Sequence, residues 1–410
     1  MNDLELLMPA GNIEKLEYAI EYGADAVYLG LTDYSLRTMR SGEVITHENL
    51  KQAIDIAHQK GKNVYCTLNI FAHNNNISKM EADLEIIKDA NPDAVIFGDL
   101  GVYSLIKKYL PDMPLHVSTQ ANTLNYEAAK FWRDMGATRI ILARELSLKE
   151  ISEIHEKVPE IQLEMLVQGA QCVSYSGRCL LSDYMTNNER KSNQGFCAQP
   201  CRWKYYLVEE NRLSEPYEIG ENEHGTYIMS PKDLALIKYL PQIAEAGVSS
   251  IKIEGRTKSM YYAANVAKTY RIALDAMKKG ENYDTDLLLQ ELKKVGNRGY
   301  TTGFALGKVP QDEYRYETSG SKAGARFYAI INNKDENGYL VKMKYKAKKG
   351  EEVEIFTPKN QGTARITEIR DVYGTEFDVA NTNQELYLKF SPTEWLENDY
   401  KMAIIRSIGE

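Results

Sequence analysis

The chain has 410 residues, a formal net charge of −8 at pH 7 and a pI near 5.5. Its length suits one large domain with a smaller one, and its acidic balance argues against general nucleic-acid binding, although a local basic patch can lie on an acidic protein. The N-terminus shows no basic segment followed by an apolar run, and no apolar run approaches the ~18 residues of a membrane span. We therefore expect a cytoplasmic protein with no membrane partner.

The N-terminal part of the chain alternates short apolar runs of β type with helical periods. Near-continuous apolar strands, each followed by a helix, indicate parallel strands that are covered on both faces. Eight such units predict an α/β fold of the TIM type, a (β/α)8 barrel, rather than an open doubly wound sheet. The predicted strands are 4–9, 26–31, 63–70, 94–99, 115–120, 139–145, 163–169 and 250–256, and the predicted helices include 13–22, 47–59, 126–135, 148–157 and 257–280.

The connection between the seventh and eighth predicted strands is abnormally long. It has about eighty residues, where a handful is usual. We assign a cysteine-bearing insertion after strand seven to residues 168–226, within a barrel domain of residues 1–320. The next segment, 227–247, reads as a short strand or turn that leads into a helix.

From about residue 322 the pattern changes to period two, which predicts a small all-β domain, a barrel, over residues 321–410. In segment 339–349 one set of side chains alternates with lysines. The first set is Val341, Met343 and Tyr345, and the second is Lys342, Lys344 and Lys346. The pattern favours the solvated face of a half-buried strand, with an edge protected by lysine as one form of it, and an RNA-contacting stripe is the alternative.

Four of the five cysteines, Cys172, Cys179, Cys197 and Cys201, lie within thirty residues of one another. A reducing compartment disfavours disulfides, and neither close pair has the C-x2-C spacing of most structural zinc sites. An iron–sulfur cluster also takes four thiolates but tolerates varied spacings, and a proline precedes Cys201 as it flanks some cluster ligands. Spacing therefore favours a cluster, with zinc as the alternative occupant.

The charge around these cysteines points the same way. Between residues 172 and 204 five basic residues stand against two acidic ones, which makes +3 in a chain of −8. A cationic shell would stabilise the negative charge that four thiolates leave on a cluster. The remaining alternative is that the four cysteines are thiols that bind no metal. The fifth cysteine, Cys66, lies inside a predicted strand, where we expect a small buried side chain.

The ends of the predicted barrel strands are consistently polar, and the C-terminal ends of such strands carry the chemistry of this fold. Guanidinium groups there can hold a carboxylate or phosphate, and carboxylates can transfer protons, although an internal salt-bridge network would produce the same residues. The catalytic candidates are Arg144, Glu145, Glu254 and Arg256, and the substrate-binding candidates are Asn69, Asp99, Gln120, Asn122 and Gln168. No H-E-x-x-H, G-x-S-x-G or P-loop motif occurs, which argues against a peptidase.

The segment Glu164–Ser182 resembles the signature of the collagenase-like peptidase family U32, Glu–x–Phe–x–x–Gly–Ser/Ala–Leu/Met–Cys–four residues–Gly–x–Cys–x–Leu/Ile–Ser. Leu166 and Gln171 depart from it, whereas both cysteines and both glycines are kept. Other blocks that resemble the family are "ELLMPAGN", "YGADAVYLG", "TLNI", "STQAN", "SPKDL", "IKIEGR" and "NRGYTTGF", so the resemblance covers roughly residues 4–305. The trailing β domain fits the longer members.

The resemblance implies more than proteolysis. The family takes its name from collagenase activity, yet other members hydroxylate RNA or ubiquinone precursors without molecular oxygen, several with a four-iron four-sulfur cluster on four cysteines. This chain is most similar to the members that hydroxylate the wobble uridine of tRNA at C5 and depend on prephenate. It implies that Cys172, Cys179, Cys197 and Cys201 bind the cluster, that tRNA and a small carboxylate such as prephenate are partners, and that the chain forms a homo-oligomer or pairs with a paralogue. A collagenase-like peptidase and a non-catalytic partner subunit are the alternatives.

Overall fold

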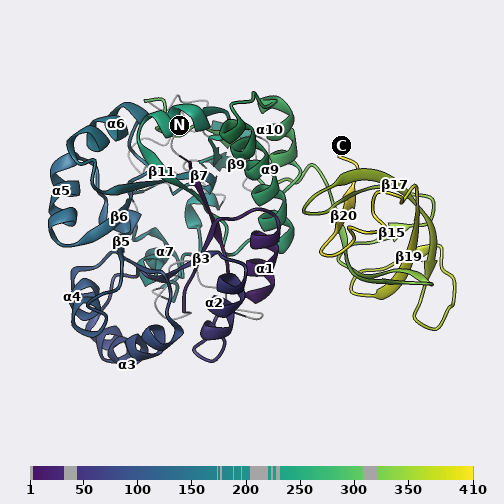
Figure 1. Ribbon diagram of the computed structural model, residues 1–410, viewed down its shortest axis with the longest axis horizontal. Helices are drawn as coiled ribbons and strands as arrows, with labels where there is room; N and C mark the ends of the chain where they lie inside the picture. The colour runs from purple at the N-terminus through teal and green to yellow at the C-terminus, as the bar shows by residue number, and fades with distance from the viewer. Residues whose placement is uncertain are drawn as a thin grey trace.

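A computed structural model describes residues 3–31, 44–172, 174–175, 178–187, 189–194, 196–203, 220–222, 225–227, 231–307 and 321–409. The chain forms two barrels that lie side by side (Figure 1). The first is a parallel barrel wrapped in helices, and the second is a smaller antiparallel barrel at the C-terminal end. Across the described ranges, no helix combines the length and apolar character needed to cross a membrane.

The N-terminal barrel has eight parallel strands, as the sequence predicts. Each pairs with the next in chain order, and β11 closes the ring by pairing with both β7 and β1. The strands are β1 (Glu5–Pro9), β2 (Ala26–Leu29), β3 (Asn63–Leu68), β4 (Ala94–Phe97), β5 (Leu115–Val117), β6 (Ala137–Ile141), β7 (Gln162–Ala170) and β11 (Val248–Ile253). Every predicted barrel strand is confirmed, and Cys66 is fully buried on β3, where burial raises the pKa of its thiol to about 12.

Helices cover the outside of this barrel (Figure 1). Their starts follow the sequence signals, since Asn12 caps the first helix and Ser147 forms a capping box with Glu150. The helices are α1 (Ile13–Glu21), α2 (Leu50–Gln59), α3 (Asn74–Ala90), α4 (Leu100–Tyr109), α5 (Tyr126–Asp134), α6 (Leu148–Lys157), α8 (Leu240–Glu245), α9 (Met260–Lys279) and α10 (Thr285–Lys293). The turn before α8 also holds β10 (Asp233–Ala235), so segment 227–247 is a short strand followed by a helix, as predicted. β10 runs antiparallel to β7 and parallel to β12 (Tyr300–Thr301).

The barrel interior contains buried charges beside a small apolar cluster that includes Leu7, Ile96 and Ile141. Glu164 of β7 is fully buried, and its carboxylate lies 3.3 Å from Arg139 and 2.8 Å from Lys252. Arg139 also reaches Glu5 at 2.6 Å, which balances two positive against two negative charges. Burial and these two cations hold the pKa of neighbouring His116 well below its ordinary value. Glu164, the first residue of the family-like motif, therefore joins β7 to β6 and β11 through ion pairs inside the barrel.

The C-terminal domain is a closed six-stranded antiparallel barrel, as predicted. Its strands are β13 (Phe327–Asp335), β14 (Gly338–Met343), β16 (Glu352–Phe356), β17 (Gln361–Arg370), β19 (Glu385–Ser391) and β20 (Ile404–Ser407). Two short strands, β15 (Ala347–Lys348) and β18 (Val379–Ala380), pair outside the ring. The predicted boundary at 320/321 adjoins residues 308–320, which lie outside the described ranges.

One prediction for this domain is wrong. β14 pairs with β13 on one side and β19 on the other, so it is not an edge strand. The strand ends at Met343, and Tyr345 is 48% exposed instead of pointing inward with Val341 and Met343. Period-two alternation continued past the end of the strand, where the chain had already turned.

Each barrel has its own hydrophobic core, and part of the second barrel packs into the core of the first. Ile330, Phe356 and Ile404 of the second barrel belong to the same buried cluster as the first. Tyr22 at the end of α1 donates a hydrogen bond from its hydroxyl to the carbonyls of Phe356 at 3.1 Å and Met402 at 2.8 Å. The junction is therefore a packed interface and holds the barrels in a fixed orientation.

Candidate active site at the barrel mouth

Two of the predicted catalytic residues form an ion pair at the C-terminal ends of the strands. Arg144 follows β6, and its guanidinium lies 3.1 Å from the Glu254 carboxylate, which follows β11. The side chains are only 11% and 15% exposed. Gly169 makes room for this arrangement: its φ is +104°, and a Cβ there would lie 2.4 Å from the Glu254 carbonyl oxygen. The β6, β7 and β11 ends thus form one charged side of the mouth.

Arg256 occupies another part of the same rim and is 7% exposed. Its Nη1 donates to the Thr67 hydroxyl at 3.0 Å, and Thr67 in turn donates to the Leu29 carbonyl at 3.0 Å. A Cβ on Gly11 would lie 2.5 Å from the Arg256 carbonyl oxygen, so a glycine is required where the two loops meet. Sequence reasoning missed Thr67, which orients the predicted arginine and sits one residue from the end of β3.

The β3 and β5 ends supply a polar wall. The Asn69 amide donates to the Ser118 hydroxyl at 3.3 Å, and the Gln120 backbone N–H donates to the same oxygen at 3.3 Å. Gln120 Oε1 is buried and has no hydrogen-bond partner among the described residues. An unsatisfied buried acceptor is costly. Gln120 Oε1 is therefore an acceptor for which the described residues supply no donor.

Three other predicted binding residues have structural tasks in the fold. The Asp99 carboxylate caps α4, accepting from the backbone N–H groups of Gly101 at 2.8 Å and Val102 at 3.1 Å. Asn122 ends a turn in the left-handed region, with φ of +52°. Gln168 is 1% exposed and accepts from the Tyr270 hydroxyl of α9 at 3.2 Å. Their role in substrate binding stays a prediction, and the proposed function does not depend on them.

Glu145 is the acidic group whose surroundings favour the protonated form. Burial raises the pKa of its carboxyl above the ordinary value, against smaller opposing effects of backbone hydrogen bonds and Arg144. Its Oε2 is buried without a hydrogen-bond partner in the part of the chain that the structure describes. A carboxyl whose pKa is raised holds its proton more tightly than an ordinary carboxyl and is better suited to general acid catalysis.

Replacing Glu145 with glutamine should change how the free energy of unfolding depends on pH. The folded state raises the pKa of the Glu145 carboxyl, so the folded protein binds the proton more tightly than the unfolded chain does. The free energy of unfolding of wild type therefore falls as pH rises from about 4.3 through the folded pKa. Glu145→Gln mimics the protonated form, so we expect equal stability at pH 4 and a more stable variant at pH 7. Urea unfolding across this range measures the difference, and a variant–wild-type difference that does not change with pH would contradict the assignment.

The cysteine insertion is organised by hydrogen bonds around Ser182, which is fully buried in α7 (Leu181–Met185). Its hydroxyl donates to the Arg190 carbonyl at 2.5 Å and accepts from the Ala198 N–H at 2.9 Å. α7 also contacts the 3-10 turn Pro200–Arg202, which contains Cys201. The segments that bear Cys179, Cys197 and Cys201 are therefore held together. Ser182 closes the family-like motif, which was the signal for it in the sequence.

Three further hydrogen bonds involve the cysteines themselves. The Ser192 hydroxyl donates to the Cys179 carbonyl at 2.6 Å, and Arg190 donates to the Cys197 carbonyl at 3.2 Å. The Gln199 N–H donates to the Cys197 sulfur at 3.3 Å. N–H···S bonds of this kind tune iron–sulfur clusters.

The insertion crosses the mouth of the barrel. It leaves β7, and its Asn193 carbonyl accepts from the Phe71 N–H in the loop after β3 at 3.2 Å. The Arg178 guanidinium lies 5.6 Å from the centre of the Phe71 ring. β3 is four strands from β7 in either direction around the ring, since the order is β7-β11-β1-β2-β3 one way and β7-β6-β5-β4-β3 the other. The insertion thus joins opposite sides of the mouth, above the predicted polar residues.

The donor set of the insertion fits an iron–sulfur cluster or zinc in kind, because it consists of four thiols with arginines beside them. The five cysteines are all thiols; Cys172 is exposed, and Cys179, Cys197 and Cys201 are half-buried. Within the described ranges, no three or more His, Cys, Asp or Glu side chains are arranged as a metal-binding group. The framework brings the cysteine-bearing segments together, while the thiols are not closed around one point.

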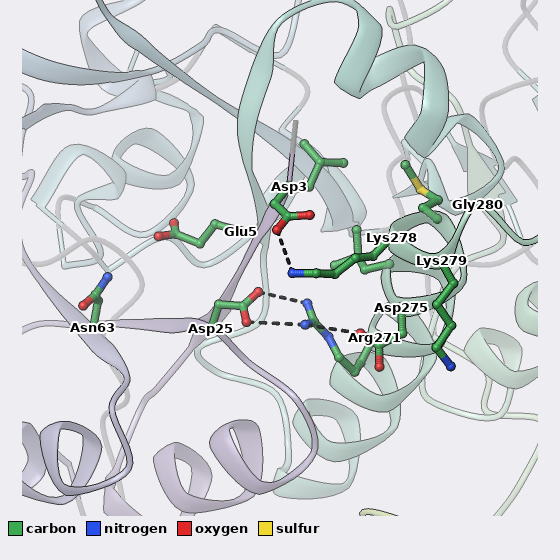
Figure 2. A pocket seen from close by; sticks show the side chains of 12 residues that line it. Asp3, Glu5, Asp25, Asn63, Arg271, Asp275, Lys278, Lys279 and Gly280 are labelled. Carbon is green, nitrogen blue, oxygen red and sulfur yellow. Dashed lines mark hydrogen bonds and ion pairs between the residues drawn. The ribbon is translucent and has the colours of Figure 1, made fainter. Parts of the chain in front are cut away.

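The opposite end of the barrel has a hollow of about 730 Å³ beside α9 (Figure 2). Two ion pairs lie among its lining residues: Asp3 with Lys278 at 2.7 Å, and Asp25 with Arg271 at 2.9 Å. Asp25 also accepts from the Leu6 N–H at 2.9 Å. None of the predicted site residues lines this hollow. Its ion pairs fasten α9 to β1 and β2, which is the stabilising role expected at the N-terminal face of such barrels.

The chain is similar in sequence to several known proteins. The tRNA hydroxylation protein P of Escherichia coli (strain K12) is 38% identical over 92% of this chain and 91% of its own length. The tRNA hydroxylation protein P1 of Bacillus subtilis (strain 168) is 40% identical over 92% of this chain and 89% of its own. A collagenase of Porphyromonas gingivalis (strain ATCC BAA-308 / W83) is 32% identical over 78% of each chain.

Family assignment agrees with these relatives. Residues 11–315 match peptidase family U32, and residues 324–406 match the peptidase family U32 C-terminal domain. The two matches fall on the parallel barrel with its insertion and on the antiparallel barrel. The chain therefore belongs to peptidase family U32.

Proposed function

We propose that this protein hydroxylates the wobble uridine of tRNA at C5, without molecular oxygen, with a four-iron four-sulfur cluster and prephenate as co-substrate. Two relatives named for tRNA hydroxylation align along nine-tenths of this chain and of their own length. The observation that carries the proposal is the insertion that joins β7 to the β3 loop, since it holds cysteine-bearing segments above a mouth lined by guanidinium and carboxyl groups.

The residues of the mouth suit the binding of an anion and a base. Arg256, oriented by Thr67, and Arg144, oriented by Glu254, would hold the carboxylates of prephenate in the bidentate manner of guanidinium groups. Gln120 Oε1 would accept the N3–H of uracil, which satisfies its buried oxygen. Glu145 would hold a proton at Oε2 and deliver it during turnover.

Cys172, Cys179, Cys197 and Cys201 would hold the cluster, with zinc as the alternative occupant. Replacing C5–H by C5–OH is a two-electron oxidation of the base, and it balances if the co-substrate gives up a hydroxyl group and takes a hydrogen in its place. When bound, the cluster would supply the electron-transfer chemistry for this exchange. Arg190 and the Gln199 N–H would stabilise its negative charge, because both already contact Cys197. Ser182 would keep the ligand-bearing segments in register across the mouth.

The experiment is nucleoside analysis of tRNA by mass spectrometry. The host strain lacks this gene, its paralogues and any oxygen-dependent enzyme for the same nucleoside. Plasmid-borne wild type should restore wobble 5-hydroxyuridine under anaerobic growth. Arg256→Lys keeps the charge but loses the planar fork, and we expect at least a tenfold lower hydroxylation. Arg365→Lys is the matched control, because Arg365 is 58% exposed on β17 of the other barrel.

Absence of 5-hydroxyuridine in the strain that carries wild type would contradict the proposal. Restoration only when a second subunit is co-expressed, with no dependence on Arg256, would support the non-catalytic partner instead. The collagenase relative makes peptidase activity the second candidate. Cleavage of denatured collagen by purified protein, lost in a barrel-mouth variant such as Glu254→Gln, would establish it.

A further inference from the structure

The C-terminal barrel carries a strongly basic segment that the proposed chemistry does not use. The thirteen residues 338–350, "GYLVKMKYKAKKG", contain five lysines and no acidic residue, in a chain of net charge −8. Lys342, Lys346, Lys348 and Lys349 are exposed and Lys344 is half-buried. Only Lys349 reaches a carboxylate within the described ranges, Glu376 at 3.8 Å, so this segment presents positive charge that its own domain does not neutralise.

An aromatic ring is fixed in the middle of this segment. Tyr345 is 48% exposed and stacks on buried Tyr328, with ring centroids 6.3 Å apart and planes 22° from parallel. Its backbone N–H donates to the Tyr328 carbonyl at 3.1 Å. The Arg326 guanidinium lies 5.8 Å from the Tyr345 ring centre. A half-exposed ring held flat, beside a planar cation, is a surface on which a nucleobase can stack.

We propose that Tyr345, Arg326 and the lysines of segment 338–350 form a docking surface for unpaired nucleotides of RNA. One base stacks on Tyr345 or the Arg326 plane, and the neighbouring phosphates lie against Lys344 and Lys346. Lys342 contributes less, because Glu385 is its cross-strand neighbour on β19. The inference rests on the proposed function, since it adds a second contact for the same tRNA outside the barrel mouth.

RNA suits this surface better than an anionic membrane. A membrane contact needs an apolar side chain free to insert between lipids, whereas Tyr345 is tied to Tyr328 through its ring and its backbone. Lys344 and Lys346 lie on either side of Tyr345 in the chain, so phosphates next to a stacked base have a cation nearby, and the fixed ring matches the flat face of that base.

The test is fluorescence anisotropy of a labelled, unmodified tRNA transcript with the full-length protein over a series of KCl concentrations. Tyr345→Leu keeps apolar contact with Tyr328 but removes stacking, so we expect binding weaker by about five- to a hundredfold. Lys344→Gln/Lys346→Gln should lower the slope of log K against log salt by about 1.4 to 1.8. The matched controls are Phe131→Leu, an aromatic of α5 that is 51% exposed, and Lys359→Gln/Lys401→Gln, two exposed lysines elsewhere on the same domain.

Unchanged affinity in Tyr345→Leu together with an unchanged salt slope in the lysine variant would overturn the docking surface. The docking surface would also be overturned if these variants bound tRNA normally but no longer adsorbed to phosphatidylglycerol vesicles, because that result would indicate a membrane contact. The same preparations are assayed for 5-hydroxyuridine. If wild type binds tRNA through Tyr345 but does not hydroxylate it, only the proposed function is refuted. If wild type hydroxylates tRNA and the variants bind tRNA normally, only the docking surface is refuted. Thermal melting of each variant confirms that it is folded.

Discussion

Cys197→Ala and Cys201→Ala should each abolish hydroxylation and remove the iron and acid-labile sulfide of protein purified without oxygen. We expect about four irons and four sulfides per wild-type chain, because a cluster of this type takes four thiolates. Cys197 and Cys201 lie on segments that Ser182 and Arg190 already hold together, so the variants should lose ligands without losing the framework. Metal analysis, sulfide analysis and the visible spectrum measure the effect.

Cys66→Ala is the control for this result. Cys66 is fully buried on β3, so its loss should cost some stability and leave iron and sulfide unchanged. One tightly held zinc per wild-type chain and no sulfide would reduce the four cysteines to a structural clamp. In that case the insertion would still cross the mouth, but the cysteines would not supply the redox chemistry that hydroxylation requires.

Arg406→Met should destabilise the protein by about 1 to 3 kcal/mol, because it removes the hydrogen bonds of a buried guanidinium to two carboxylates at the junction of the barrels. Lys294 then remains as the cation beside them, 2.6 Å from Glu291 and 2.9 Å from Glu354. Arg406 is fully buried and donates to Glu354 at 2.7 Å, to Glu291 of α10 at 2.6 Å and to Asn265 of α9 at 2.5 Å. Burial alone would raise the pKa of Glu354, yet Arg406 holds it below the ordinary value. The midpoint and slope of urea unfolding measure the loss.

The form of the unfolding curve adds a second readout. Because a packed, buried interface joins the two barrels, wild type should unfold in one transition, whereas a weakened interface should separate it into two. Arg365→Met is the matched control: its partner Glu352 is as exposed as itself, and such pairs contribute less than about 1 kcal/mol. An Arg406→Met variant as stable as this control would show that the junction does not depend on its buried charge.

Most of the fold could be predicted because each barrel strand is a short apolar run with its own helix. The errors lie where a repeating pattern outlasts its element. Strand six was predicted through Glu145 but ends at Ile141, and the lysine alternation runs past the end of β14 at Met343. Periodicity reports which face a residue would occupy and does not report where the chain turns.

The candidate site shows a different limit. Strand-end residues such as Arg144 and Glu254 could be grouped in advance because parallel strands end on one rim. Gln168 satisfied the same rule, yet its amide bonds Tyr270, which follows it by about a hundred residues, and no local pattern contains that contact. Thr67 was missed for the converse reason, since a hydroxyl inside an apolar strand becomes informative only when its partner is known.

The bridge from β7 to the β3 loop restricts what can reach the site beneath it. A segment joined to the barrel at both β7 and the β3 loop limits entry to its flanks, and a single nucleotide needs a narrower opening than a stacked helix does. The target base would therefore have to be extruded from its neighbours before reaction, and extrusion costs least where a base is already unpaired. Selection of a loop nucleotide over a paired one would then follow from steric access alone, before any contact reads the identity of the base.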